Sequence, residues 1–136
     1  MTTNLLANID VDDLARGIEF YCRVLGLRVG RRFGSTGAEL LGASSPIYLL
    51  EKPVGSSVSV ATDQCRDYSR HWTPVHLDFV VEDIDAAIEK AKAAGALLEG
   101  ETSTHKWGRI AVMADPFGHG FCLIEFRGRG YDEIAS

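Results

Sequence analysis

The stretch IDVDDLARGIEFYCRVLGL at residues 9–27 combines the end of an apolar strand, a cap, an amphipathic helix and a glycine. Asp13 is placed to accept the free N–H groups of a first helical turn, and apolar side chains then recur at helical spacing up to Leu25. Gly26 is the residue type that most often ends a helix. The stretch therefore predicts a strand over 5–11 followed by a helix that begins after Asp13 and stops at Gly26.

The same pattern returns at FVVEDIDAAIEKAKAAGAL, residues 79–97, with a constant offset of 70 residues from Asp13 to Asp83. The segment IYLLE at 47–51 also resembles FCLIE at 121–125, at an offset of 74. Two halves in the order strand, helix and three strands predict an α+β fold of two βαβββ modules related by a pseudo-two-fold. We expect curved mixed β-sheets that enclose a cavity, with the helices outside. Chance agreement between two amphipathic helices is the alternative.

The expected boundaries follow from hydrophobic runs and turn residues. The chain is predicted to be one domain over 1–136, with a first module at about 4–53, a linker at 54–73, a second module at about 74–127 and an irregular tail at 128–136. Besides the first strand, strands are expected at 27–33, 38–41, 46–52, 75–81, 96–99, 108–114 and 121–126.

Composition limits the classes of partner. The net charge of −5 and the scattered Lys and Arg residues argue against nucleic acid, which requires clustered basic side chains. Three widely spaced cysteines form no disulfide framework or CxxC pair, which favours a reducing compartment. No apolar run reaches membrane-spanning length, and the N-terminus lacks the features of a signal peptide. We therefore expect a cytoplasmic protein with no membrane partner.

Two stretches together resemble a known family. The first is residues 9–21 followed by Val24-Leu25-Gly26-Leu27, and the second joins residues 76–87 to the turn Asp115-Pro116-Phe117-Gly118 and its following strand. They are similar to the opening strand and helix, and to the second-half strand, helix and hairpin, of the glyoxalase/bleomycin-resistance/extradiol dioxygenase (vicinal oxygen chelate) superfamily. The likeness extends over nearly the whole chain and is closest to metal-free glyoxalase-like or bleomycin-resistance-like members.

The resemblance has consequences for metal binding. In metal-using members the ligands come from the first and last strands of each half, and these positions correspond here to Leu6, Tyr48, His76 and Cys122. Only His76 is a usual ligand, whereas a tight site normally needs three or four protein ligands. We therefore expect no metal. A divalent zinc, nickel, iron or manganese ion held by His76 is the alternative. Alternation along a strand predicts that Glu51 and Glu125 face away from the cavity.

The candidate ligand-binding residues share the inward side of the predicted strands or lie at their rims: Asn8, Tyr48, His76, Asp78, Trp107, Arg109 and Cys122. If the protein is an enzyme, His76 and Asp78 are the candidate catalytic acid and base. Structural explanations stand beside these roles. His76 can be a satisfied interior histidine, Arg109 can pair with Asp78, and Cys122 can be a small apolar filler.

Other ring-bearing residues have weaker assignments. Trp72 and Trp107 are plausible rims of a cleft, because indole rings combine a large apolar surface with one polar group. Phe33 is expected to cap a core. His105 and His119 lie in expected loops and are predicted to be solvated.

The candidate residues are compatible with three functions. The first is binding of a small organic molecule between the modules without a metal, as in the drug-sequestering resistance proteins that the chain resembles. The second is a metal-dependent glyoxalase-type lyase, isomerase or dioxygenase, and the third a metal-free enzyme using His76 and Asp78. The resemblance also implies a homodimer, with or without modules exchanged between the chains.

Overall fold

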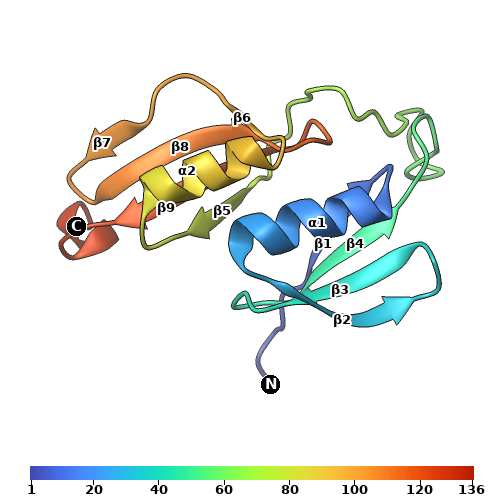
Figure 1. Cartoon of the computed structure of the whole chain (residues 1–136), viewed down its shortest axis with the longest axis horizontal. Coiled ribbons are helices and arrows are strands. Elements are labelled where there is room, and N and C mark those ends of the chain that lie inside the picture. Colours follow the sequence, from blue (N-terminus) through green and yellow to red (C-terminus); the bar gives the residue numbers. More distant parts are fainter. The chain divides into compact units, whose positions relative to one another are not determined.

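The computed structural model describes residues 1–136, which divide into two compact units, Met1–Tyr68 and Ser69–Ser136. Each unit contains one α-helix and one mixed β-sheet (Figure 1). The division falls inside the stretch 54–73 that the sequence assigns as a linker. Residues of that stretch contact the unit to which they belong: Arg66 pairs with Asp10 at 2.7 Å, and Arg70 pairs with Glu99 at 2.7 Å.

The first unit is a four-stranded sheet in the order β1-β4-β3-β2, with helix α1 (Figure 1). The strands β1 and β4 are parallel and the other two pairs are antiparallel. Its elements are β1 (Ala7–Val11), α1 (Leu14–Leu25), β2 (Arg28–Phe33), β3 (Gly37–Leu41) and β4 (Ile47–Glu51).

Helix α1 begins and ends where the sequence predicts. The Asp13 side chain accepts a hydrogen bond from the Arg16 backbone N–H at 3.1 Å, and Gly26 ends the helix with a φ of 67°. Glu51 provides a second cap, because its Oε2 accepts a hydrogen bond from the Leu14 N–H at 2.8 Å. Buried Ile9, Val11, Leu40 and Leu49 of the sheet and buried side chains of the helix form the core of this unit.

The second unit is a five-stranded sheet in which β5, β9, β8 and β6 follow one another and a short strand β7 also pairs with β8. Its elements are β5 (Leu77–Val80), α2 (Ile84–Ala93), β6 (Leu97–Leu98), β7 (Ser103–His105), β8 (Gly108–Ala114), β9 (Gly120–Phe126) and the 3-10 helix η1 (Gly130–Glu133). The predicted α+β class with two strand–helix–three-strand modules is confirmed, the second module carrying one additional strand.

The internal repeat extends to the details of capping and register. The Asp83 side chain caps α2 through the Ala86 N–H, as Asp13 caps α1, and Glu125 accepts from the Ile84 N–H at 3.3 Å, as Glu51 does in the first unit. In the parallel pairs, Asn8 lies opposite Tyr48 and Asp78 opposite Cys122. These pairs reproduce both sequence offsets, so the similarity of the two halves is structural and not a chance agreement of two helices.

Two elements were not predicted. Strand β7 lies in a stretch with no apolar run, and it forms because its backbone pairs with the longer strand β8. The tail forms η1, where Tyr131 packs against Trp107 with ring centroids 5.1 Å apart, so the expectation of an irregular tail is wrong for these residues. Tertiary contact stabilises both segments, and such contact leaves no periodic pattern in the sequence.

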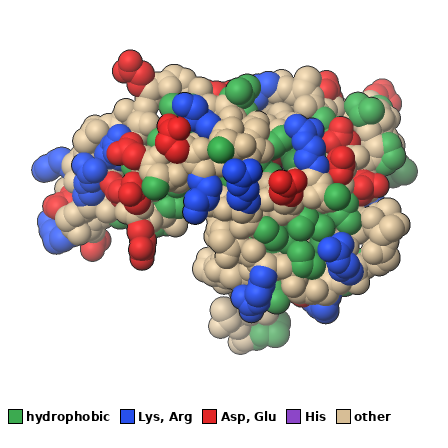
Figure 2. All heavy atoms as spheres, viewed as in Figure 1, with side chains coloured by type: hydrophobic (Ala, Val, Ile, Leu, Met, Phe, Trp, Pro, Cys, Tyr) green, Lys and Arg blue, Asp and Glu red, His purple; other side chains and the backbone are tan.

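The charged surface differs between the units. On the face shown in Figure 2, acidic and basic side chains are interspersed over the second unit, whereas basic and hydrophobic side chains predominate over β2 and β3. The strand β2 alone contributes Arg28, Arg31 and Arg32. Neither of the two α-helices combines the length and apolar character that a membrane crossing requires.

Candidate functional site

The face of each sheet opposite its helix carries five of the seven predicted site residues, and we call it the helix-free face. In the first sheet Ile9 and Leu49 are buried on the helix side, so alternation places their neighbours Asn8 and Tyr48 on the helix-free face. In the second sheet Asp78 lies opposite Cys122 on the corresponding face. The parity argument from sequence is thus confirmed within each unit.

A compact polar cluster of His76, Asp78 and Cys122 lies on the helix-free face of the second sheet. The His76 Nε2 and Asp78 Oδ1 atoms are 3.1 Å apart, and the ligand atoms of all three residues lie within 4.8 Å of one another. The side chains of His76 and Asp78 are 51% and 38% exposed, whereas Cys122 is buried. His76 is therefore not a satisfied interior histidine, and it is accessible to a bound molecule.

The Cys122 thiol is held in its protonated form. Burial raises the pKa of Cys122 to about 11, and the neighbouring Asp78 carboxylate adds to the shift by its charge and by a hydrogen bond. A thiol with this pKa is neutral at physiological pH and donates to the carboxylate. Cys122 is thus a hydrogen-bonding partner of Asp78 as well as a small side chain in the core.

The cluster fits the chemistry of a metal site with three protein ligands. Its imidazole, carboxylate and thiol are the donor types that zinc prefers, and ligand atoms of a tetrahedral zinc site lie roughly 3.3–3.8 Å apart. The separations of up to 4.8 Å require only a small inward movement. His76, Asp78 and Cys122 would hold the ion and leave a fourth position for a substrate oxygen. Such an ion would supply Lewis-acid polarisation of that oxygen and would lower the pKa of the thiol.

The equivalent place in the first unit has different chemistry. Asn8 and Tyr48 provide neither an imidazole nor a thiol, and the charged group there is Glu39 of β3, opposite Tyr48. Arg31 binds the Glu39 carboxylate through its Nε at 3.1 Å, its Nη2 at 2.7 Å and its backbone N–H at 3.0 Å. The Tyr48 hydroxyl donates to the same carboxylate at 3.2 Å.

This network keeps Glu39 ionised. The hydrogen bonds from Arg31 lower the pKa of Glu39 to about 2, against an opposing effect of desolvation, and the same contact raises the pKa of Arg31. Glu39 is only 7% exposed, whereas the Arg31 side chain is 67% exposed. A carboxylate largely shielded from water thus orients a guanidinium group that reaches into solvent.

A β-bulge in β2 makes the network possible. The register against β3 shifts by one residue between Val29 and Arg32, so Gly30 and Arg31 both lie on the side of Glu39. A Cβ on Gly30 would lie 2.6 Å from Glu39 Oε1 and 2.8 Å from a methyl carbon of Leu41. Gly30 therefore leaves the space that the Glu39 carboxylate occupies.

Phe33 belongs to this surface and not to a core. Its ring is 44% exposed and lies 6.0 Å from the Tyr48 ring, centroid to centroid. The Arg31 guanidinium carbon is 5.6 Å from the centre of the Phe33 ring. The expectation that Phe33 caps a core is wrong, because the bulge changes which side of the strand it occupies.

Two predicted site residues lie apart from the cluster. Arg109 is on the helix-covered side of β8 and pairs with Asp85 of α2 at 3.0 Å, so the suggested pairing with Asp78 is wrong. Trp107 stacks on His105 with ring centroids 5.0 Å apart and also contacts Phe126 and Tyr131. Arg109 and Trp107 thus both have partners within the second unit. A ligand-binding role for either residue stays a prediction. Trp72 is largely exposed.

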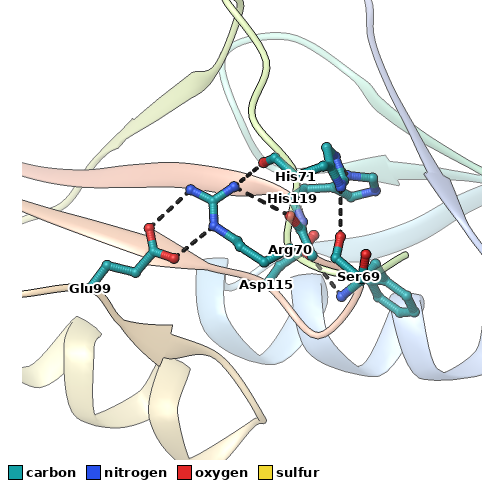
Figure 3. A network of polar contacts seen from close by, with 8 residues as sticks. Ser69, Arg70, His71, Glu99, Asp115 and His119 are labelled. Atoms are coloured by element: carbon teal, nitrogen blue, oxygen red, sulfur yellow. Dashed lines mark hydrogen bonds and ion pairs between the residues drawn. The ribbon is translucent and has the colours of Figure 1, made fainter. Parts of the chain in front are cut away.

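A second polar network fastens residues 69–71 to the rest of the second unit (Figure 3). Arg70 forms a bidentate pair with Glu99, and His71 Nδ1 lies 2.9 Å from the Ser69 carbonyl oxygen. His71 Nδ1–H therefore donates to that carbonyl, and His71 Nε2 lies within hydrogen-bond distance of His119 Nδ1, at 2.9 Å. His119 is thus hydrogen-bonded and half-buried, contrary to the expectation that it is solvated.

Sequence reasoning missed Arg31, Glu39 and the second helix caps, Glu51 and Glu125. Two signals were present for the first pair: a glycine inside a strand pattern suggests a bulge, and a glutamate inside the apolar run AELL suggests a polar partner. For Glu51 and Glu125 the parity argument was correct, since both side chains point to the helix side. Each caps a helix because its strand brings it within hydrogen-bond distance of the first N–H group of that helix.

Comparison with known families assigns the chain. The family model described as a glyoxalase-like domain matches residues 7–124, which include both units. The chain belongs to the glyoxalase-like family. The superfamily resemblance inferred from residues 9–27 and 76–123 is thereby confirmed.

Relatives of this glyoxalase-like chain have varied descriptions. An uncharacterised protein of Mycobacterium bovis is 32% identical over 123 residues, covering 88% of this chain and 80% of its own length. The anthracycline biosynthesis protein DnrV of Streptomyces peucetius is 31% identical, covering 91% of this chain and 41% of that protein. A probable lactoylglutathione lyase of Vibrio cholerae is 29% identical, with coverages of 85% and 84%.

Solved structures share the fold. The fosfomycin resistance protein FosX of Listeria monocytogenes has a TM-score of 0.70 at 19% identity, covering 93% of this chain and 95% of its own. A variant of the same protein, complexed with Mn(II), has a TM-score of 0.70 at 22% identity, with coverages of 91% and 90%.

Proposed function

We propose that this glyoxalase-like protein binds a small organic molecule through the helix-free face of its second sheet and needs no metal to do so. The observation that carries the proposal is the cluster of His76, Asp78 and Cys122, with an accessible imidazole and a carboxylate that already accepts from a neutral thiol. An imidazole beside a carboxylate offers a hydrogen bond to a ligand. At the equivalent positions of the first unit, Asn8 and Tyr48 offer an amide and a phenol in place of metal ligands.

The second candidate is a metal-dependent lyase, isomerase or dioxygenase of the same superfamily. It is favoured by one observation, the convergence of an imidazole, a carboxylate and a thiol within 4.8 Å. If a divalent ion were bound, His76, Asp78 and Cys122 would hold it and it would supply Lewis-acid chemistry to a substrate oxygen; the ion would also have to offset the raised pKa of the Cys122 thiol.

Elemental analysis separates the two candidates. Protein purified without chelator is expected to contain far less than one divalent metal ion per chain. The same protein is expected to bind 2-naphthamide, a neutral planar amide, and NMR titration measures this binding. His76→Ala should weaken that binding several-fold, and His105→Ala, which removes a histidine outside the cluster, should not. About one zinc, nickel, iron or manganese ion per chain that is lost in His76→Ala would overturn the metal-free proposal. Absence of binding by neutral, anionic and cationic naphthalenes alike would overturn binding itself.

We also propose that the protein forms a homodimer in a cytoplasmic setting. Strands β1 and β2 are the edges of the first sheet, and β5 is an edge of the second. Leu5, Leu6 and Val80 expose apolar side chains beside these edges. Unpaired edges and apolar surface are usually covered by a partner. Light scattering at micromolar concentration should give twice the chain mass of 14.8 kDa, and a monomer would contradict the proposal.

A further inference from the structure

In the first unit, four side chains meet on the helix-free face: Arg31, Glu39, Tyr48 and Phe33. We propose that Arg31 recognises a carboxylate or similar oxyanion on a planar small molecule, which lies against Phe33 and Tyr48. The inference goes beyond the proposed function, because it concerns the first unit alone and names the chemical class of ligand that this unit would bind.

Contacts within the chain fix the orientation of the Arg31 guanidinium group and leave one of its nitrogen atoms, Nη1, available to a ligand. Its Nε and Nη2 atoms are bound to Glu39, and Nη2 also donates to the Tyr48 hydroxyl at 3.2 Å. The N–H groups on Nη1 have no partner within the chain, and the side chain is 67% exposed. A held guanidinium loses little conformational freedom when its remaining N–H groups bind an oxyanion.

The local charge favours an anion although the whole chain carries −5. On the helix-free face of the first sheet, Asp10 is paired with Arg66 and Glu39 is paired with Arg31. Arg28 lies on the same face, opposite Leu41, and no acidic side chain pairs with it. The five charged groups named here, Arg66 included, therefore sum to one excess positive charge. A nearby positive charge strengthens the binding of an anionic group.

The aromatic rings provide a surface for a flat apolar body. The Phe33 ring lies beneath the Arg31 guanidinium, and the Phe33 and Tyr48 rings are tilted by 41° to each other. Exposed ring faces beside a guanidinium bind planar molecules through apolar contact and stacking. An ion pair that served stability alone would need neither the exposed ring nor the unpaired N–H groups, and surface ion pairs contribute little to stability.

Three probes of nearly equal shape and different charge test the inference: 2-naphthoate, 2-naphthamide and 2-naphthylmethylammonium, with dissociation constants from NMR titration. We expect wild-type protein to bind 2-naphthoate on the order of 10-fold more tightly than the amide, as for one charge-assisted hydrogen-bonding group. Arg31→Gln should abolish this preference. Arg31→Lys should lose most of it, because an ammonium cannot hold Glu39 bidentately and present a second edge.

Arg32→Gln is the matched control. It removes the same charge from the adjacent residue, but Arg32 lies opposite buried Ala38 on the helix-covered side, beside Leu14 and Ile18. This variant should keep the preference for 2-naphthoate. Arg31→Gln leaves the Glu39 carboxylate without its partner. The double variant Arg31→Gln/Glu39→Gln therefore provides a second test in which no carboxylate is left unpaired. It should also bind the three probes equally.

Two results would overturn the inference: equal affinity of wild-type protein for the three probes, or an equal loss of preference in Arg31→Gln and Arg32→Gln. In either case binding of the neutral amide that depends on His76 would leave the proposed function intact. Failure of all three probes to bind would contradict the proposed function itself.

Discussion

Replacing Gly108 by alanine is expected to destabilise the second unit by about 3 kcal/mol or more. Gly108 begins β8, has a φ of 149°, and lies between His105 of β7 and Phe126 of β9. A Cβ at this position would collide with the carbonyl oxygen of Glu125, which is backbone and cannot rotate away. The strands β8 and β9 would have to separate where the sheet turns towards β7.

The measurement is the free energy of unfolding from urea denaturation, and Gly34→Ala is the control. Gly34 also has a positive φ, 60°, but a Cβ there meets no atom within 4 Å. Its replacement should cost only the backbone strain, about 1–2 kcal/mol. Equal losses in the two variants would show that the collision at Glu125 is relieved by movement of the strands, and would contradict this account of Gly108.

Phe117→Ala is expected to cost about 3–5 kcal/mol, the usual range for truncation of a buried phenylalanine. The residue lies in the turn before β9, yet its side chain is fully buried. The Asp115 carboxylate holds this turn by accepting hydrogen bonds from the Phe117 N–H at 2.8 Å and the His119 N–H at 2.9 Å. The turn therefore holds the backbone of a fully buried aromatic residue in place.

Phe33→Ala provides the comparison, because it removes the same ring from the exposed helix-free face of the first sheet. This variant should change the free energy of unfolding by less than about 1 kcal/mol. Thermal and urea denaturation of the two variants check the difference. A loss in Phe33→Ala as large as that in Phe117→Ala would mean that Phe33 is buried in solution and is not available to a ligand.

Local patterns in the sequence were sufficient for most of the architecture. Asp13 and Asp83 could be identified as caps because a cap acts on N–H groups only three residues away. Strand alternation placed Tyr48 and Cys122 correctly on the helix-free faces, since side chains alternate with a period of two wherever the register is regular. The offsets between the halves then identified equivalent positions without any coordinates.

Contacts between distant segments decided the rest. The bulge at Gly30 breaks the alternation, so it moved Arg31 and Phe33 to a face that a period of two does not predict. The pairing of Arg109 with Asp85 rather than Asp78 depends on which side of β8 faces α2. The sequence by itself determined the repeated strand–helix order, the helix limits and the family. The tertiary structure alone brought Arg31 to Glu39, because their side chains meet only after β2 and β3 pair in a shifted register.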